Sequence, residues 1–190
     1  LEVLADADAP SVEMVSPTNG ALLNSTSVLL EWNVTDEGSG VAGIWIKVDG
    51  GNWTEVSGST LTLLLDGGPH TVTVRAADVV GNQAEANATI VVDTTAPSVA
   101  SFAPQGVDVV LDAPIVITFS EAMDTGSVTV TVNGETATLS WNGTTATAIG
   151  EWEYDSEYAV VINGRDLAGN AMEQAVMSFT TLEQLVIISG

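Results

Sequence analysis

The 190-residue chain contains no cysteine and only one histidine, His70. Without cysteine it can form no disulfide framework, and its sequence carries no sign of the redox state of its compartment. A single histidine also excludes the common zinc sites and most arrangements of nucleophile, base and orienting group. Any catalysis would therefore have to use carboxylates alone.

Basic residues are almost as scarce. The chain has Lys47, Arg75 and Arg165 against 25 aspartates and glutamates, which gives a formal net charge of −22. This balance argues against nucleic acid and anionic membranes as partners, because both are bound through clustered lysine and arginine. Such a surface attracts cations, keeps a β-rich protein soluble or suits a saline habitat.

Long hydrophobic runs are also missing. Hydrophobic residues make up 45% of the chain, yet no uninterrupted run approaches the roughly 20 residues of a membrane-spanning helix. The chain opens at Leu1 without a basic n-region, so we expect any targeting signal to lie elsewhere in a longer protein. We expect no direct insertion into a membrane.

What the chain does contain is an internal repeat. The segment DADAPSV (6–12) returns as DTTAPSV (93–99), and DVVGN (78–82) returns as DLAGN (166–170) near the end of each copy. The repeat predicts two domains and a tail, whose Leu-Val-Ile-Ile run is a candidate for an extra strand: residues 1–92, 93–181 and 182–190.

Within each repeat, hydrophobic residues alternate with polar ones. Val28, Leu30 and Trp32 share one face of a segment, which is the period of a half-buried strand. Asn-Gly pairs at 133–134 and 142–143 are strong hairpin signals. The pattern predicts an all-β protein made of two tandem immunoglobulin-like antiparallel β-sandwiches of about seven strands each. The expected strands cover residues 28–34, 44–48, 61–65, 72–76, 84–92, 115–119, 128–132, 137–141 and 158–162.

Longer motifs carry a family resemblance. Through PQGVD (104–108), APIVITFSEAMD (113–124), RDLAGN (165–170) and SFTT (178–181), the second repeat resembles the Ig-like domain family of prokaryotic surface-layer proteins. The resemblance implies a non-catalytic domain in an extracellular or cell-surface location.

The first repeat is similar to the Ig-like repeats of prokaryotic surface proteins and large adhesins. The motifs are TDEGSGV (35–41), AADVVGN (76–82) and VVDTTAP (91–97), with Val79 and Val80 where those repeats usually carry a small residue. Some adhesin repeats hold calcium at their junctions, and the resemblance extends that expectation to this chain.

Acidic residues recur where an immunoglobulin-like topology would bring three segments to one pole of each domain. Carboxylates about 4 Å apart repel by roughly 4 kcal/mol per pair at an effective dielectric of 20, so gathering them calls for protons, solvent or a cation. Calcium, a hard ion with oxygen ligands, fits best, and no other cofactor is expected. The candidate ligands are Asp6, Asp36 and Asp78 in the first repeat, accompanied by Asp8 and Glu37, and Asp93, Glu121, Asp124 and Asp166 in the second.

Two interpretations of these residues stay open. In the simpler one, Asp78 and Asp166 only accept backbone N–H groups in Asx-type turns. In the other, Asp93, Asp124 and Asp166 hold one calcium ion and stiffen the junction between the domains.

Trp45 points away from the predicted core and Trp53 follows a short turn, so together they are candidates for an aromatic platform that binds sugar. The alternative is that an outward tryptophan covers a neighbouring strand or the stem of Arg75. Five glycosylation sequons, at Asn24, Asn33, Asn52, Asn87 and Asn142, also fall on turns or predicted outward faces.

Enzymatic function is not expected. Glu151 and Glu153 are an acidic pair, but their spacing places both on one side of a single strand, with no facing cleft. We expect a structural or adhesive spacer module of an extracellular or cell-surface protein, with other domains of that protein and cell-surface glycans or proteins as partners. The alternative is a carbohydrate-binding accessory module of a secreted hydrolase.

Overall fold

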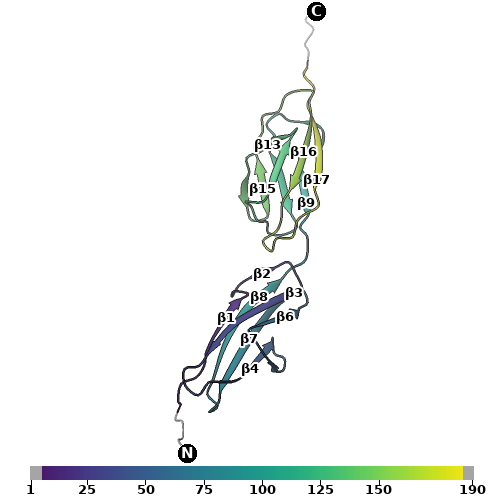
Figure 1. Ribbon diagram of the computed structural model, residues 1–190. Helices are drawn as coiled ribbons and strands as arrows, with labels where there is room; N and C mark the ends of the chain where they lie inside the picture. The colour runs from purple at the N-terminus through teal and green to yellow at the C-terminus, as the bar shows by residue number, and fades with distance from the viewer. Residues whose placement is uncertain (1–5, 186–190) are drawn as a thin grey trace, which may run out of the picture. The chain divides into compact units, whose positions relative to one another are not determined.

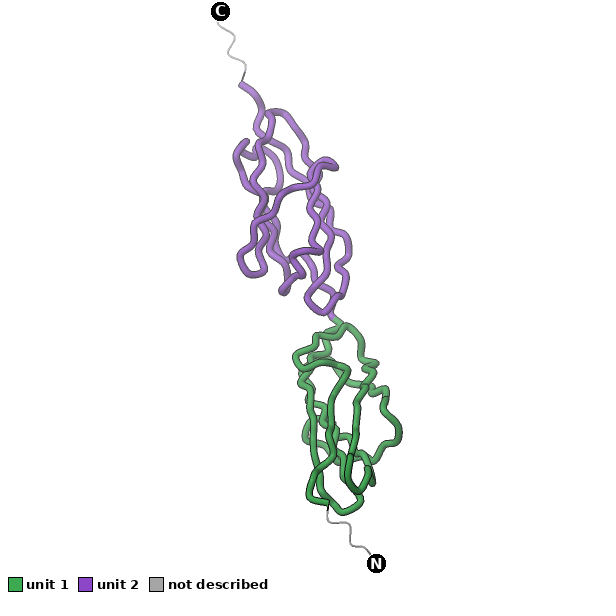
Figure 2. Tube along the Cα trace, turned by 60° about the vertical axis from the view of Figure 1, so that its left-hand side comes forward, with its two compact units in different colours: residues 1–94 green, residues 95–190 purple. Residues whose placement is uncertain are grey.

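The computed structural model describes residues 6–185 of the chain. The chain divides into two compact units, residues 1–94 and 95–190 (Figure 2). Among the described residues, every regular element is a β-strand (Figure 1). The prediction of an all-β protein is confirmed.

Unit 1 is a sandwich of two sheets. A three-stranded sheet runs in the order β1-β3-β6 and packs on a five-stranded sheet in the order β2-β8-β7-β4-β5. The bounds are β1 (Ser11–Ser16), β2 (Leu22–Leu23), β3 (Ser27–Thr35), β4 (Val41–Val48), β5 (Thr54–Val56), β6 (Thr60–Leu64), β7 (Gly68–Asp78) and β8 (Gln83–Val92).

The core of unit 1 follows from the alternation along its strands. Leu30 and Trp32 of β3 are 0% and 1% exposed, and they face Val72 and Val74 of β7, which are both 0% exposed. Residues between them on the same strands point outward, because successive side chains of a strand alternate faces. The outer face of the five-stranded sheet is thereby left to the odd-numbered residues of β4, β7 and β8.

Unit 2 repeats the plan with a four-stranded sheet, β14-β15-β11-β9, and a five-stranded sheet, β10-β17-β16-β12-β13. Its largest buried side chains include Phe119 and Phe179, each 2% exposed. The bounds are β9 (Val99–Ala103), β10 (Gly106–Val109), β11 (Ile115–Phe119), β12 (Thr129–Val132), β13 (Glu135–Thr136), β14 (Ser140–Asn142), β15 (Thr145–Ala148), β16 (Glu157–Asn163) and β17 (Ala175–Thr181).

The two units also share their exceptions. Nearly all strand pairs are antiparallel, but β2 runs parallel to β8 in unit 1 and β10 runs parallel to β17 in unit 2. A cis proline, Pro17 or Pro104, follows the first strand of each unit. The duplication read from the sequence thus extends to the topology of the sheets.

One predicted strand is wrong. Residues 137–141 do not form a single strand: the Ala137 N–H still donates to the Val130 carbonyl in one sheet, whereas β14 at Ser140–Asn142 pairs with β15 in the other. The chain passes from one sheet to the other between Ala137 and Ser140. The alternating pattern of hydrophobic residues continues across this crossing, so it looks like one strand in the sequence although the residues pair in two different sheets. In the predicted tail, the Leu182 N–H donates to the Val109 carbonyl, and residues 186–190 lie outside the described part of the chain.

Candidate functional site

The Asp-x-x-Gly-Asn loop of unit 1 joins β7 to β8. Asp78, which ends β7 and is 2% exposed, accepts the N–H groups of Gly81 and Asn82 on Oδ1 at 2.6 and 2.8 Å. The Asn82 amide donates to Asp78 Oδ2 at 2.8 Å and also to the carbonyl oxygens of Asp6 and Asp8 at 3.3 and 3.1 Å. The loop is therefore an Asx-type turn that also fastens the segment entering the unit.

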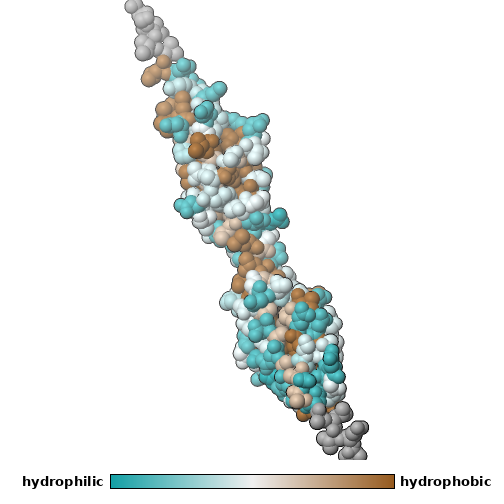
Figure 3. Space-filling model, turned by 90° about the vertical axis from the view of Figure 1, so that its left-hand side faces the viewer, coloured by the Kyte–Doolittle hydropathy of each residue, from teal (hydrophilic) through white to brown (hydrophobic). Residues whose placement is uncertain are grey.

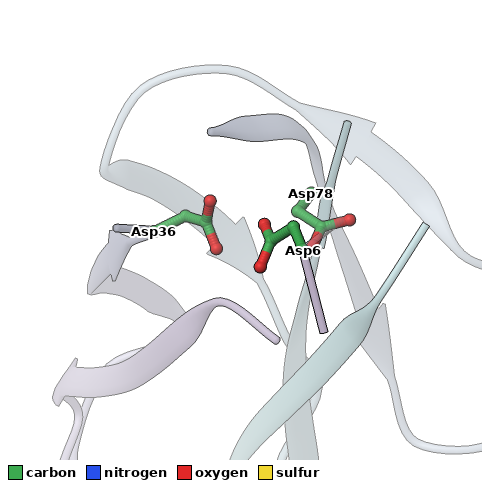
Figure 4. Close-up of side chains that lie close together, drawn as sticks. All are labelled: Asp6, Asp36 and Asp78. Atoms are coloured by element: carbon green, nitrogen blue, oxygen red, sulfur yellow. The ribbon is translucent and has the colours of Figure 1, made fainter. Parts of the chain in front are cut away.

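Three acidic segments converge at this end of unit 1, as the sequence predicts (Figure 4). Asp6, Asp36 and Asp78 each offer a carboxylate oxygen, and these atoms lie within 4.8 Å of one another. Asp6 Oδ2 accepts the Ser39 N–H at 2.6 Å, and Asp36 Oδ1 accepts the Gly40 N–H at 2.5 Å. We call Asp6, Asp36 and Asp78 the acidic trio.

Hydrogen bonds from backbone and side-chain N–H groups stabilise the negative charge of Asp6 and Asp78. They lower the pKa of Asp6, chiefly through the Ser39 N–H. At Asp78, burial is the largest influence and raises the pKa, but the hydrogen bonds from Asn82 and Gly81 outweigh it and the net pKa is lowered. The repulsion between Asp6 and Asp78 is smaller than these contributions. Hydrogen bonds from N–H groups thus already stabilise the ionised forms of Asp6 and Asp78.

The corresponding loop of unit 2 has the same geometry. Asp166, 2% exposed, accepts the N–H groups of Gly169 and Asn170 on Oδ1 at 2.7 and 2.8 Å, and the Asn170 amide donates to Oδ2 at 2.7 Å. The segment that carries Asp124 lies beside this loop, because the preceding residue, Met123, forms an antiparallel β-bridge with Asp166.

The remaining predicted ligands of the second repeat divide between the units. Asp124 Oδ2 lies 3.6 Å from Arg165 Nε, and both side chains are largely exposed. Glu121 is half-buried in unit 2. Asp93 belongs to unit 1, where its N–H donates to the Leu23 carbonyl at 2.8 Å. That Asp93, Asp124 and Asp166 share one calcium ion stays a prediction.

Trp45 and Trp53 lie on the outer side of the five-stranded sheet of unit 1. The Arg75 guanidinium stacks 3.8 Å from the centroid of the Trp53 ring, and Lys47 Nζ lies 4.4 Å from it. Arg75 is held in turn by Glu85, at 2.6 Å from Nη2 to Oε1. Trp53 therefore covers the guanidinium of Arg75, a role close to the one that the alternative interpretation gave to an outward tryptophan.

Trp45 has a different environment. Its indole lies over Gly43, two residues back on the same face of β4, so closely that a Cβ at Gly43 would stand 2.6 Å from the ring. Trp45, Trp53, Arg75 and Gln83 line a pocket of about 170 Å³. We call these four residues with Lys47 the tryptophan pocket. The sequence analysis did not single out Gly43 or Gln83. Both lie on the outward face of the five-stranded sheet, as Trp45 does, because Gly43 pairs with Ala77 and Ala77 pairs with Gln83.

The acidic pair Glu151 and Glu153 is not on a strand, so this detail of the sequence analysis is wrong. Both residues are exposed in the connection between β15 and β16, where Trp152 between them turns inward and its Nε1 donates to the Ala113 carbonyl at 2.7 Å. The Glu153 N–H donates to the hydroxyl of Tyr158 at 2.9 Å. The hydrogen bonds of Trp152 and Tyr158 therefore fix the positions of the two glutamates.

Three further observations concern the described residues. All five sequon asparagines are exposed: Asn24, Asn33, Asn52, Asn87 and Asn142. Hydrophilic residues cover much of the face shown in Figure 3, with hydrophobic residues in separate patches. Among residues 6–185 there is no helix with the length and apolar character needed to cross a membrane.

Two sandwiches of this topology define the class of immunoglobulin-like proteins. A family model described as a bacterial Ig domain matches residues 10–132, and another described as a bacterial Ig-like domain matches residues 93–181. The chain belongs to the bacterial Ig-like domains, which confirms the resemblance seen in the sequence.

Among curated proteins, the chain is similar to chitinase A1 of Niallia circulans, with 33% identity over 94% of this chain. The match takes in 27% of the chitinase, so the chain spans about a quarter of that relative.

Solved structures similar to the chain include fibronectin(III)-like modules of Clostridium thermocellum CbhA, with a TM-score of 0.52, 14% identity, and coverage of 91% of this chain and 95% of that one. Titin domains I67–I69 give a TM-score of 0.57 and 16% identity, with coverage of 92% of this chain and 65% of that one. At these identities the likeness concerns the fold alone.

Proposed function

We propose that this chain is a non-catalytic accessory segment of an extracellular polysaccharide-degrading enzyme, in which two Ig-like domains act as a spacer. The observation that carries the proposal is the 33% identity with chitinase A1 across 94% of this chain. Because the chain matches about a quarter of that protein, the hydrolase itself would lie outside the segment. The polysaccharide concerned is chitin or another β-1,4-linked glycan.

The structure supports a mechanical role. Each sandwich fills its interior with side chains, such as Trp32 in unit 1 and Phe179 in unit 2, which are 1% and 2% exposed. Closely packed interiors deform little, so each domain would behave as a stiff element that presents loops at its ends. The spacer in a surface-layer or adhesive protein, the leading expectation from the sequence, uses the same mechanics with different neighbouring domains.

The test is to remove residues 6–181 from the parent enzyme and measure hydrolysis of insoluble chitin and of a soluble chito-oligosaccharide. We expect slower hydrolysis of the solid and an unchanged rate on the oligosaccharide, because the active site is intact while its placement on the solid is lost. A Gly/Ser linker of equal length is the matched control and should not restore activity on the solid. Equal rates of the truncated and intact enzymes on insoluble chitin would contradict the proposal.

We also propose that calcium stiffens the acidic poles of the domains. The supporting observation is that oxygens of Asp6, Asp36 and Asp78, from three separate segments, lie within 4.8 Å of one another. Oxygen donors without nitrogen or sulfur suit a hard cation. A calcium ion there would link the entering segment to the two loops.

A further inference from the structure

The few cations of this chain are distributed unevenly. Of its three basic residues, two, Lys47 and Arg75, meet at the ring of Trp53 on one sheet face. Arg75 lies opposite Trp45 on the neighbouring strand and opposite Glu85 on the other side. In a chain with a net charge of −22, this is a local group of hydrogen-bond donors set among acidic residues.

The position of Trp45 depends on Gly43. Only a residue without a Cβ leaves room for the indole to lie along the sheet, since an added Cβ would stand 2.6 and 3.0 Å from two carbons of the ring. Gly43 pairs with Ala77 on β7, so the neighbouring strand is also small at this point. Trp45 is thus half-buried by contact with the sheet on one side, and the pocket of about 170 Å³ opens beside it.

We propose that the tryptophan pocket binds a single chain of a neutral β-linked polysaccharide. The indole of Trp45 stacks on the C–H face of one pyranose ring, and Arg75, Lys47 and Gln83 exchange hydrogen bonds with its hydroxyl groups. An apolar plane beside a few convergent polar groups is the usual composition of a small-ligand site. This inference rests on the proposed function for the class of polysaccharide.

Charge selects a neutral ligand. The two cations attract the electron-rich hydroxyl oxygens of a sugar, but one of them is already paired with Glu85 at 2.6 Å. The remaining surface repels polyanions, because the chain carries 25 acidic residues. Stacking of Arg75 and Lys47 on Trp53 holds the far wall of the pocket in place before ligand arrives, which lowers the entropic cost of binding.

The experiment uses the complete 190-residue chain. Its affinity for a hexamer of β-1,4-linked N-acetylglucosamine is measured by calorimetry, with cellohexaose as comparison and retention on insoluble chitin as a second readout. Trp45→Ala should weaken binding by about tenfold or more, as loss of a central tryptophan does at other interfaces. Gly43→Ala keeps the tryptophan but displaces its ring, so it should weaken binding as well.

Two controls separate binding from folding. Tyr154→Ala removes an aromatic side chain of unit 2 that is 46% exposed and should leave the affinity unchanged. Circular dichroism and the proton signal of His70 report whether each variant is folded. The proposal is overturned if the unaltered chain binds neither hexamer, or if folded Trp45→Ala and Gly43→Ala bind as tightly as the unaltered chain.

Failure of this inference can be told apart from failure of the spacer proposal. If the chain binds no oligosaccharide but its removal still slows the parent enzyme on insoluble chitin, the pocket assignment is wrong and the spacer role stands. If the chain binds the hexamer and its removal has no effect on hydrolysis, the pocket assignment stands and the spacer role in a hydrolase is wrong.

Discussion

The two units share one loop almost atom for atom. The bond from the Gly81 N–H to Asp78 Oδ1 is 2.6 Å, and the bond from the Gly169 N–H to Asp166 Oδ1 is 2.7 Å. In each loop the glycine has a left-handed backbone, with φ of 100° in unit 1 and 97° in unit 2, which any other residue adopts only with strain. Because these hydrogen bonds lie within the loop itself, they stabilise the loop in the same way in both units.

The units differ in where they place their aromatic side chains. In unit 2, Trp152, Tyr158 and Phe179 pack together with ring centroids 4.8 to 5.2 Å apart. In unit 1, Trp45 and Trp53 stand on the outer face of a sheet beside two cations. The shared loop indicates a common framework, and the outward aromatics of unit 1 show where the two copies differ.

The largest effect we expect separates inward from outward tryptophans within unit 1. Trp32→Ala should destabilise the unit by about 3–5 kcal/mol, because it empties the centre of the core. Trp45→Ala, on the outer face, should cost less than half as much. Urea unfolding followed by the His70 proton signal measures unit 1 alone. Equal losses for the two variants would show that Trp45 is a core residue, and the pocket would then be only a packing defect.

Calcium is expected to have the next largest effect. For a site with a Kd of about 0.1 mM, a hundredfold excess of calcium adds about 2.7 kcal/mol to stability. Melting of unit 1 should therefore shift upward between chelator and excess calcium, and Asp36→Asn should abolish most of the shift. Asp66→Asn, which removes an exposed carboxylate of unit 1 outside the acidic trio, is the matched control. An identical melting temperature with chelator and with calcium would mean that backbone N–H groups alone maintain the trio.

The shared loop provides a smaller test of equivalence. Asp166→Ala leaves the Gly169 and Asn170 N–H groups without their acceptor and should cost unit 2 about 1–3 kcal/mol. Asp78→Ala should cost unit 1 at least as much, because the same side chain orients Asn82 against the carbonyls of Asp6 and Asp8. Chemical unfolding, followed separately in each unit, measures the loss of stability in each variant and shows whether Asp78→Ala costs at least as much as Asp166→Ala. A harmless Asp78→Ala would show that the loop is held by the strands and not by its aspartate.

The carboxylates of Asp6 and Asp78 contribute to the response of unit 1 to acid. The pKa values of Asp6 and Asp78 are lowered from 3.8 in the folded protein. A depressed folded pKa contributes stability that is present above pH 3.8 and is lost as the pH falls below it. We expect unit 1 to lose stability in that range, and Asp78→Ala to flatten this part of the stability curve. If the Asp78→Ala variant loses stability below pH 3.8 as steeply as the unaltered chain, other carboxylates are responsible for the loss.

Much of the fold and of the candidate site can be predicted from the sequence. The rest depends on contacts between segments that lie far apart in the chain. Alternation predicts β3 because Leu30 and Trp32 face the core along the whole strand. It fails at residues 137–141, where the chain passes from one sheet to the other. Sequence also predicts that Asp6, Asp36 and Asp78 converge, since topology fixes which loops share a pole. It suggests that an outward tryptophan covers Arg75, but it does not single out Trp53, because that choice depends on the register between β4, β5 and β7.

The smallest effect concerns the only histidine. His70 Nδ1 lies 3.0 Å from Asp49 Oδ2 and Nε2 lies 2.9 Å from the Asp66 carbonyl, so both ring nitrogens face acceptors. Only the imidazolium can donate to both, and its hydrogen bond to the Asp49 carboxylate, followed by that to the Asp66 carbonyl, raises the pKa of His70 above 6.5. The resulting stability is present below pH 6.5 and is lost as the pH rises through the folded pKa.

Asp49→Asn tests this assignment. Asparagine tolerates the left-handed backbone at position 49, where φ is 53°, and keeps an acceptor for the Thr71 N–H, so the fold should persist. We expect the pKa of His70 to fall toward 6.5 and stability near neutral pH to drop by less than about 1 kcal/mol, because Asp49 is half-exposed and screened by salt. Asp66→Asn should hardly move the titration, since its main-chain carbonyl is the acceptor. NMR titration of His70 measures both, and equal shifts in the two variants would mean that diffuse negative charge, and not the Asp49 hydrogen bond, sets the pKa.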